Sequence, residues 1–146
     1  MKGFGGSNRK TKKSIKTANN LQKDQLISNA FSLHSNGKIR EASEIYNFLI
    51  QNKIYDPRVF NNLGSIYFQR KHFDKAISLF DESIKRFPNS LEAYTNLANV
   101  LIIKGKSDIA RRILKKAIEL NPKYLKSYSI LARILVGEGN LEKAEF

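Results

Sequence analysis

Two consecutive stretches of this chain repeat the same order of apolar residues. Residues 57–90 read PRVFNNLGSIYFQRKHFDKAISLFDESIKRFPNS, and residues 91–124 read LEAYTNLANVLIIKGKSDIARRILKKAIELNPKY. In both stretches a large residue is followed by a leucine and a small residue: Phe60, Leu63 and Gly64 recur as Tyr94, Leu97 and Ala98. A fixed period of 34 residues indicates stacked copies of one supersecondary unit, because one copy cannot bury its apolar face alone.

Each stretch predicts two antiparallel helices. In residues 57–90 one apolar stripe holds Phe60, Leu63, Ile66 and Tyr67, and a second holds Ala76, Ile77, Phe80 and Ile84. Both stripes have the spacing of a single helical face. Asp56 is placed to cap the first helix and Pro57 to begin it, while Ser90 is placed to cap the helix that follows. Gly64 and Ala76 lack bulk where the paired helices should approach most closely, so we expect larger residues there to push the helices apart.

The layout extends in both directions along the chain. The earliest unit has Ile54 where the others have proline, and terminal units of a repeat array are expected to be atypical. In the last unit we expect Leu131, Ile134 and Leu135 to be partly uncovered, so that further chain or a partner would cover this end. We therefore expect an all-α domain over residues 21–146, with three full units at 23–56, 57–90 and 91–124 and a truncated fourth at 125–146.

These positions resemble the tetratricopeptide repeat. The family pattern of large–x2–Leu–Gly/Ala–x2–Tyr, then Ala–x3–Phe, then Pro is found in Phe60, Leu63, Gly64, Tyr67, Ala76, Phe80 and Pro88. The resemblance covers residues 23–146 and implies a right-handed α-solenoid, whose first helices line a concave groove that holds a peptide or a helix of a partner. The N-terminal head is also similar to that of short bacterial proteins of this kind, whose repeats are often fused to a downstream transferase or other enzyme domain.

Candidate binding residues lie on the first helix of each unit. Asn62 and Asn96 occupy equivalent places, and an amide side chain offers both donors and an acceptor to a peptide group. In some peptide-binding relatives, asparagines at this place form a ladder along the groove. Ser28 and Ile130 stand at the equivalent places in the outer units, so we expect a ladder of two rungs or, alternatively, amides that only face water. The neighbouring groove positions are polar or basic: Arg58, Asn61, Ser65, Thr95, Asn99, Lys126, Ser129 and Arg133.

This set favours a partner with carboxylates. The family's carboxylate clamp for acidic C-terminal tails needs lysine and asparagine in the first unit, where this chain has Ile27 and Phe31. The resemblance therefore does not imply that clamp.

Positive charge is concentrated at the N-terminus. The chain carries a net charge of +13. Residues 1–20 contain no acid and six basic residues: Lys2, Arg9, Lys10, Lys12, Lys13 and Lys16. We expect this head to be disordered because it has little apolar surface to bury. It would serve as an electrostatic arm for nucleic acid or an acidic partner, or only as a solvated tail.

A second basic run, Arg111, Arg112, Lys115 and Lys116, falls on one broad helical face. Such a run is consistent with a solvated surface, or with a patch that binds phosphate or acidic groups.

The sequence indicates no chemistry of catalysis. The chain has no cysteine, and His34 and His72 lack further ligands at helical spacing, so we expect neither a metal nor a cofactor. No apolar run reaches the length of a membrane span, and we expect a cytoplasmic protein. The predicted function is a non-enzymatic adaptor that binds a peptide or helix of a partner. The alternatives are a targeting or scaffold module of a longer enzyme, and weak nucleic-acid binding through the basic head.

Overall fold

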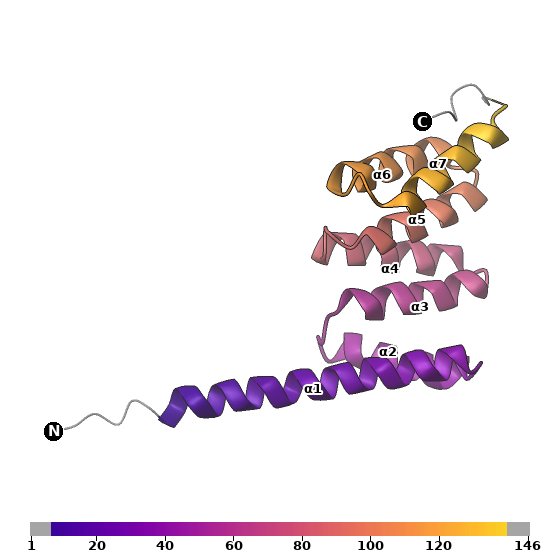
Figure 1. The fold of residues 1–146 in the computed structure, drawn as a ribbon. Coiled ribbons are helices and arrows are strands. Elements are labelled where there is room, and N and C mark those ends of the chain that lie inside the picture. The colour runs from indigo at the N-terminus through magenta and orange to yellow at the C-terminus, as the bar shows by residue number, and fades with distance from the viewer. Residues whose placement is uncertain (1–6, 140–146) are drawn as a thin grey trace. The chain divides into compact units, whose positions relative to one another are not determined.

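The computed structural model describes the backbone of residues 7–139 and the side chains of residues 19–139, and within these ranges it confirms the all-α fold (Figure 1). The helices are α1 (Ser7–Ser35), α2 (Ile39–Gln51), α3 (Pro57–Gln69), α4 (Phe73–Arg86), α5 (Leu91–Ile103), α6 (Ser107–Leu120) and α7 (Leu125–Gly137). They form two compact units, Met1–Tyr55 and Asp56–Phe146, each of which is described by itself. In the described part of the chain, no helix is long and apolar enough to cross a membrane.

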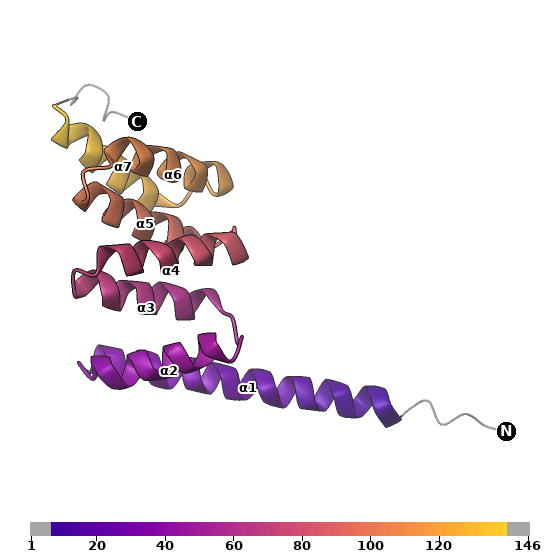
Figure 2. The same cartoon turned by 180° about the vertical axis from the view of Figure 1, so that it is seen from behind.

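The first unit is the antiparallel hairpin of α1 and α2. Its core consists of buried side chains from both helices: Ile27, Ala30, Ala42, Tyr46 and Leu49. Helix α1 has 29 residues and α2 has 13, so α1 continues well beyond the end of α2 (Figures 1 and 2). Only the C-terminal part of α1 is therefore packed against its partner helix.

The basic head differs from the disordered segment that we expected for residues 1–20. Helix α1 begins at Ser7, so residues 7–20 are helical, whereas residues 1–6 lie outside the described part. No proline or glycine occurs between Ser7 and Ser35. The helix that packs on α2 can therefore continue toward the N-terminus without a residue that breaks it.

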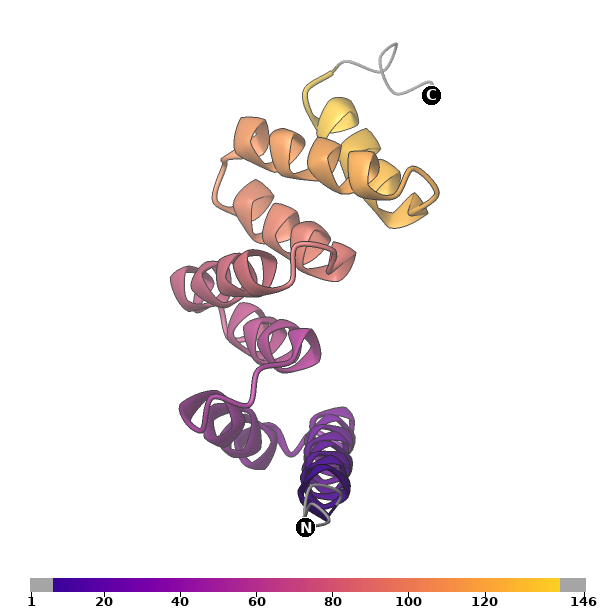
Figure 3. The ribbon, with the colours of Figure 1, turned by 90° about the vertical axis from the view of Figure 1, so that its left-hand side faces the viewer.

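The second unit stacks α3 to α7 in chain order (Figures 1 and 3). Helices α3, α5 and α7 begin at Pro57, Leu91 and Leu125, which coincide with the first residues of the predicted units. Asp56 caps α3 as expected, because its side chain accepts a hydrogen bond of 3.0 Å from the Arg58 backbone N–H. The buried core of this unit runs through all five helices, and its largest members include Phe60, Phe80, Tyr94, Leu97 and Leu114.

Two local expectations were wrong. Ser90 stands at the start of α5 but makes no capping hydrogen bond through its side chain. Its hydroxyl accepts a hydrogen bond from Asn61 Nδ2 at 3.3 Å. In α7, Leu131 and Ile134 are 7% and 4% exposed, since α5 and α6 both pack against this helix. Of the three residues that we expected to be uncovered, only Leu135 is half-exposed.

The inter-helix turns share one backbone feature. Gly37, Lys71, Gly105 and Gly139 occupy equivalent positions, and all have a positive φ, between 61° and 78°. Glycine adopts this left-handed conformation without strain, whereas lysine does not. Lys71 is therefore a strained residue at a position where its repeat equivalents are glycine.

Candidate binding surface

Helices α3, α5 and α7 carry two rows of side chains at matching positions. One row contains Asn62, Asn96 and Ile130, and the other contains Ser65, Asn99 and Arg133. Helix α5 contacts both α3 and α7, so consecutive members of a row lie on neighbouring helices. We define the first-helix face as Asn62, Ser65, Asn96, Asn99, Ser129 and Arg133.

The amides of Asn62 and Asn96 are available for binding. Both side chains are half-buried. Among the hydrogen bonds of residues 19–139 neither amide has a partner. Each offers two N–H donors and a carbonyl acceptor. In the third place of this row Ile130 is only 5% exposed, so the row of amides ends at α5.

The second row ends in a positive charge. Arg133 Nη2 donates a hydrogen bond to Asn99 Oδ1, which joins α7 to α5 across this face. Arg133 remains exposed, and within the described residues it forms no ion pair. Helix α7 contains Lys126 as a second exposed cation and no aspartate or glutamate. The face is therefore basic at its α7 end.

At the opposite end the positive charge is compensated. Arg58 donates from Nε to Asp56 Oδ1 and from Nη2 to Asp56 Oδ2, each at 2.8 Å. This bidentate pair holds the guanidinium against the start of α3. On α5 the exposed Glu92 adds a negative charge. Of the three cations that we expected along the face, Lys126 and Arg133 are thus the ones on the basic end.

Two expected groove residues, Asn61 and Thr95, are placed differently. Asn61 is 2% exposed and Thr95 is fully buried, so neither can contact a partner on this face, and the prediction for both was wrong. Each precedes the amide row by one residue, about 100° around the helix. Thr95 Oγ1 donates to the Glu92 carbonyl at 3.0 Å within its own helix. Ser129 is exposed as expected, but its hydroxyl donates to the Leu125 carbonyl at 3.2 Å.

The sequence analysis missed one apolar residue on the same stripe of α5. Ile103 is 56% exposed and follows Asn96 by seven residues and Asn99 by four. This spacing places it on the same helical face as both asparagines. The spacing could have been read from the sequence, but an isoleucine at that spacing is more often part of a core.

The basic run on α6 does not form one open surface. Arg111 Nη2 donates to Glu138 Oε2 and its Nη1 to Asp108 Oδ1, so Arg111 ties α6 to the end of α7. The exposed cations that remain are Arg112, Lys115 and Lys116. Across residues 19–139 no cluster of His, Cys, Asp and Glu could hold a metal ion.

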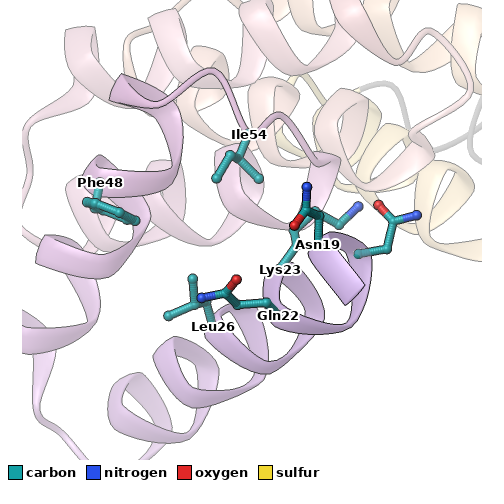
Figure 4. Close-up of a pocket in the computed structure, with 7 residues that line it drawn as sticks. Asn19, Gln22, Lys23, Leu26, Phe48 and Ile54 are labelled. Carbon is teal, nitrogen blue, oxygen red and sulfur yellow. The ribbon is translucent and has the colours of Figure 1, made fainter. Parts of the chain in front are cut away.

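Each unit also contains an open pocket. In the first unit a pocket of about 440 Å³ lies between α1 and the end of α2, where Leu26, Phe48 and Ile54 provide apolar surface and Asn19 and Gln22 provide amides (Figure 4).

In the second unit a pocket of about 330 Å³ lies at the start of α4 and is lined by His72, Asp74 and three lysines. A hydrogen bond from Lys104 and its positive charge lower the pKa of the Asp74 carboxyl.

Comparison with known families supports the repeat assignment. Residues 55–123 match the tetratricopeptide repeat model. A probable UDP-N-acetylglucosamine–peptide N-acetylglucosaminyltransferase of Arabidopsis thaliana, SEC, is 32% identical over 92 residues, or 61% of this chain. The chain spans 9% of the length of that curated relative.

Solved structures share the fold. A MamA structure superposes with a TM-score of 0.74 at 19% identity, covering 99% of this chain and 90% of MamA. The type III secretion translocator chaperone SycD of Yersinia enterocolitica gives a TM-score of 0.72 at 25% identity, covering 80% of this chain and 93% of SycD. A thermophilic repeat protein of Thermus thermophilus gives 0.73 at 19% identity, covering 84% and 69%.

Proposed function

Residues 55–123 of this chain are tetratricopeptide repeats, and from this premise we propose a non-catalytic module that binds an extended peptide of a partner protein on the first-helix face. Repeats of this kind stack into surfaces that bind other proteins. The similarity to a translocator chaperone supports a protein as the partner. The absence of cysteine fits action in a reducing compartment, the cytoplasm, where disulfides are rare.

One observation carries this proposal: Asn62 and Asn96 are half-buried amides, at equal positions on neighbouring helices, without a partner among the described residues. Neither amide is among the side-chain atoms of the described residues that are buried without a partner, so water can bond to both, and a bound peptide group can replace that water. A peptide backbone repeats one donor and one acceptor per residue. Two amides at matched positions can therefore hold an extended backbone without selecting its side chains.

The test is a paired affinity capture from lysate, followed by mass spectrometry and binding measurements on the purified partner. The wild-type chain is compared with the double variant Asn62→Ala/Asn96→Ala and with the control Asn36→Ala/Asn89→Ala, whose asparagines are exposed elsewhere. We expect a partner whose affinity falls at least tenfold in the first variant and is unchanged in the control. Equal affinity for all three proteins would refute the assignment of the face.

A second function is favoured by the similarity to the N-acetylglucosaminyltransferase relative. In this alternative the repeats are the substrate-recruiting part of a longer enzyme, and the same face would bind the enzyme's protein substrates. Sequencing the gene on both sides of the present chain distinguishes the two functions. A catalytic domain in the same reading frame supports the second function, whereas stop codons on both sides of the repeats support the first.

A further inference from the structure

From the charge on α7 we infer that the partner peptide carries an aspartate or glutamate about three residues from the residue held by Asn96, and that Arg133 binds this carboxylate. The inference rests on the proposed function, because it specifies which peptide the first-helix face prefers. It adds a residue with a defined role and a sequence register that the amide row alone does not provide.

The hydrogen bond between Arg133 and Asn99 fixes where the charge lies. Arg133 uses one guanidinium nitrogen, Nη2, to reach Asn99 Oδ1. A guanidinium has five N–H donors, so it retains donors for a bidentate carboxylate. Because its partner is a neutral amide and not an acid, the hydrogen bond orients Arg133 along the face without neutralising its charge.

The surroundings of Arg133 favour an anion. Lys126 lies two turns earlier on the same helix, and α7 has no acidic residue. On the other first helices of this unit, α3 and α5, the one cation is Arg58, and it is paired with Asp56. The α7 end of the first-helix face is therefore where an incoming carboxylate finds charge that the protein does not already compensate.

The register follows from helix spacing. Axes of packed helices lie about 8–10 Å apart, and an extended peptide advances about 3.3 Å per residue. One step from α3 to α5, or from α5 to α7, therefore corresponds to about three peptide residues. A peptide that places one backbone amide on Asn62 and another, about three residues on, on Asn96 reaches Arg133 after about three more.

The row of amides ends where the basic residues of α7 begin. Ile130 replaces the asparagine of the first row on α7 and is buried, so α7 offers no amide for the backbone. What α7 offers instead is Arg133 in the second row, one turn further along the helix. The face thus binds backbone over α3 and α5 and a side-chain carboxylate over α7.

The test uses a display library of random linear peptides about 12 residues long, which is enough to cross three helices. The library is selected against the full chain, and selected peptides are measured by fluorescence anisotropy. We expect aspartate or glutamate to be enriched at one position of the aligned peptides. Arg133→Gln should weaken binding of these peptides about tenfold, the order expected for a charge-assisted hydrogen bond. The control Arg112→Gln, an exposed arginine on α6, should not change it.

The outcomes separate this inference from the proposed function. Peptides that bind without acidic enrichment, and that depend on Asn62 and Asn96 but not on Arg133, would overturn the inference and leave the proposed function standing. Selected peptides that are insensitive to the double asparagine variant, or a selection without any binder, would overturn both. If Arg112→Gln weakens the binding of acidic peptides, the inference would also be overturned, because the carboxylate would then bind on α6.

Discussion

The close approach of α3 and α4 at Gly64 predicts how the second unit responds to one added methyl group. A Cβ atom built on Gly64 would lie 2.5 Å from Phe80 Cε1 and 2.9 Å from both Cδ1 and Cζ of that ring. Phe80 is 1% exposed and is surrounded by core, so the ring cannot move away without displacing its neighbours. Forcing an extra carbon into a packed core costs about 1–3 kcal/mol.

Helix propensity opposes this cost and must be separated from it. Replacing glycine by alanine inside a helix stabilises the helix by about 1 kcal/mol. Gly137, in the last turn of α7, provides the matched control because a Cβ added there meets nothing within 4 Å. We therefore expect Gly137→Ala to raise the melting temperature slightly and Gly64→Ala to lower it or leave it unchanged. At about 4–8 °C per kcal/mol for a small domain, the two variants should differ by about 5–20 °C.

Thermal unfolding followed by circular dichroism measures both variants, and a compensating change tests the cause. In the next 34-residue repeat, Ala98 and Leu114 stand at the positions equivalent to Gly64 and Phe80. Combining Gly64→Ala with Phe80→Leu should therefore recover part of the loss, and a double-mutant cycle should show coupling between the two sites. If Gly64→Ala is as stabilising as Gly137→Ala, the reasoning about this contact is refuted.

Two further predictions concern the turn that follows α3. Lys71→Gly should raise the melting temperature by the equivalent of about 0.5–1 kcal/mol, because it relieves a left-handed lysine at the place where the next unit has Gly105; an unchanged or lower value would contradict this. Asp74→Asn should lower the melting temperature at neutral pH, since the depressed pKa of Asp74 means that its ionised form is stabilised in the folded protein by Lys104. That stabilisation is present above the ordinary pKa of 3.8 and is lost as the pH falls through the folded value. The difference from wild type should therefore vanish in strong acid, and a difference of equal size at neutral and strongly acidic pH would contradict this.

Much of the fold could be predicted because its determinants repeat. Phe60 and Tyr94 are 34 residues apart, and so are Leu63 and Leu97. Helices with apolar stripes at these matching positions have few other ways to bury them. The cap at Asp56 was also predictable, since it depends only on neighbouring residues. The helical state of residues 7–20 was not, because composition alone does not reveal that an adjacent packed helix continues through a polar segment.

The binding surface was less predictable because the exposure of a side chain depends on how the neighbouring repeat packs against its helix. Asn61 and Asn62 are adjacent and chemically identical, yet one is buried against the start of α5 and the other is half-exposed without a partner. A rotation of about 100° separates them. The period of the repeat identifies equivalent positions, but it does not say which of two neighbouring positions faces the next helix.

Ion pairs between successive repeats of the second unit also could not be predicted from the period of the repeat. Asp74 pairs with Lys104, and the equivalent places in the next unit hold Asp108 and Glu138. Two acids at matched positions would repel each other, but Arg111, at the place of Ile77, bonds to both. Equivalent contacts between successive repeats are thus made by Lys104 in one case and by Arg111, from a different helix position, in the next. Because Arg111 is used between repeats, the basic run of α6 is reduced to the exposed cations Arg112, Lys115 and Lys116. We expect acidic groups to bind on the first-helix face instead, because Asn99 orients the unpaired Arg133 there.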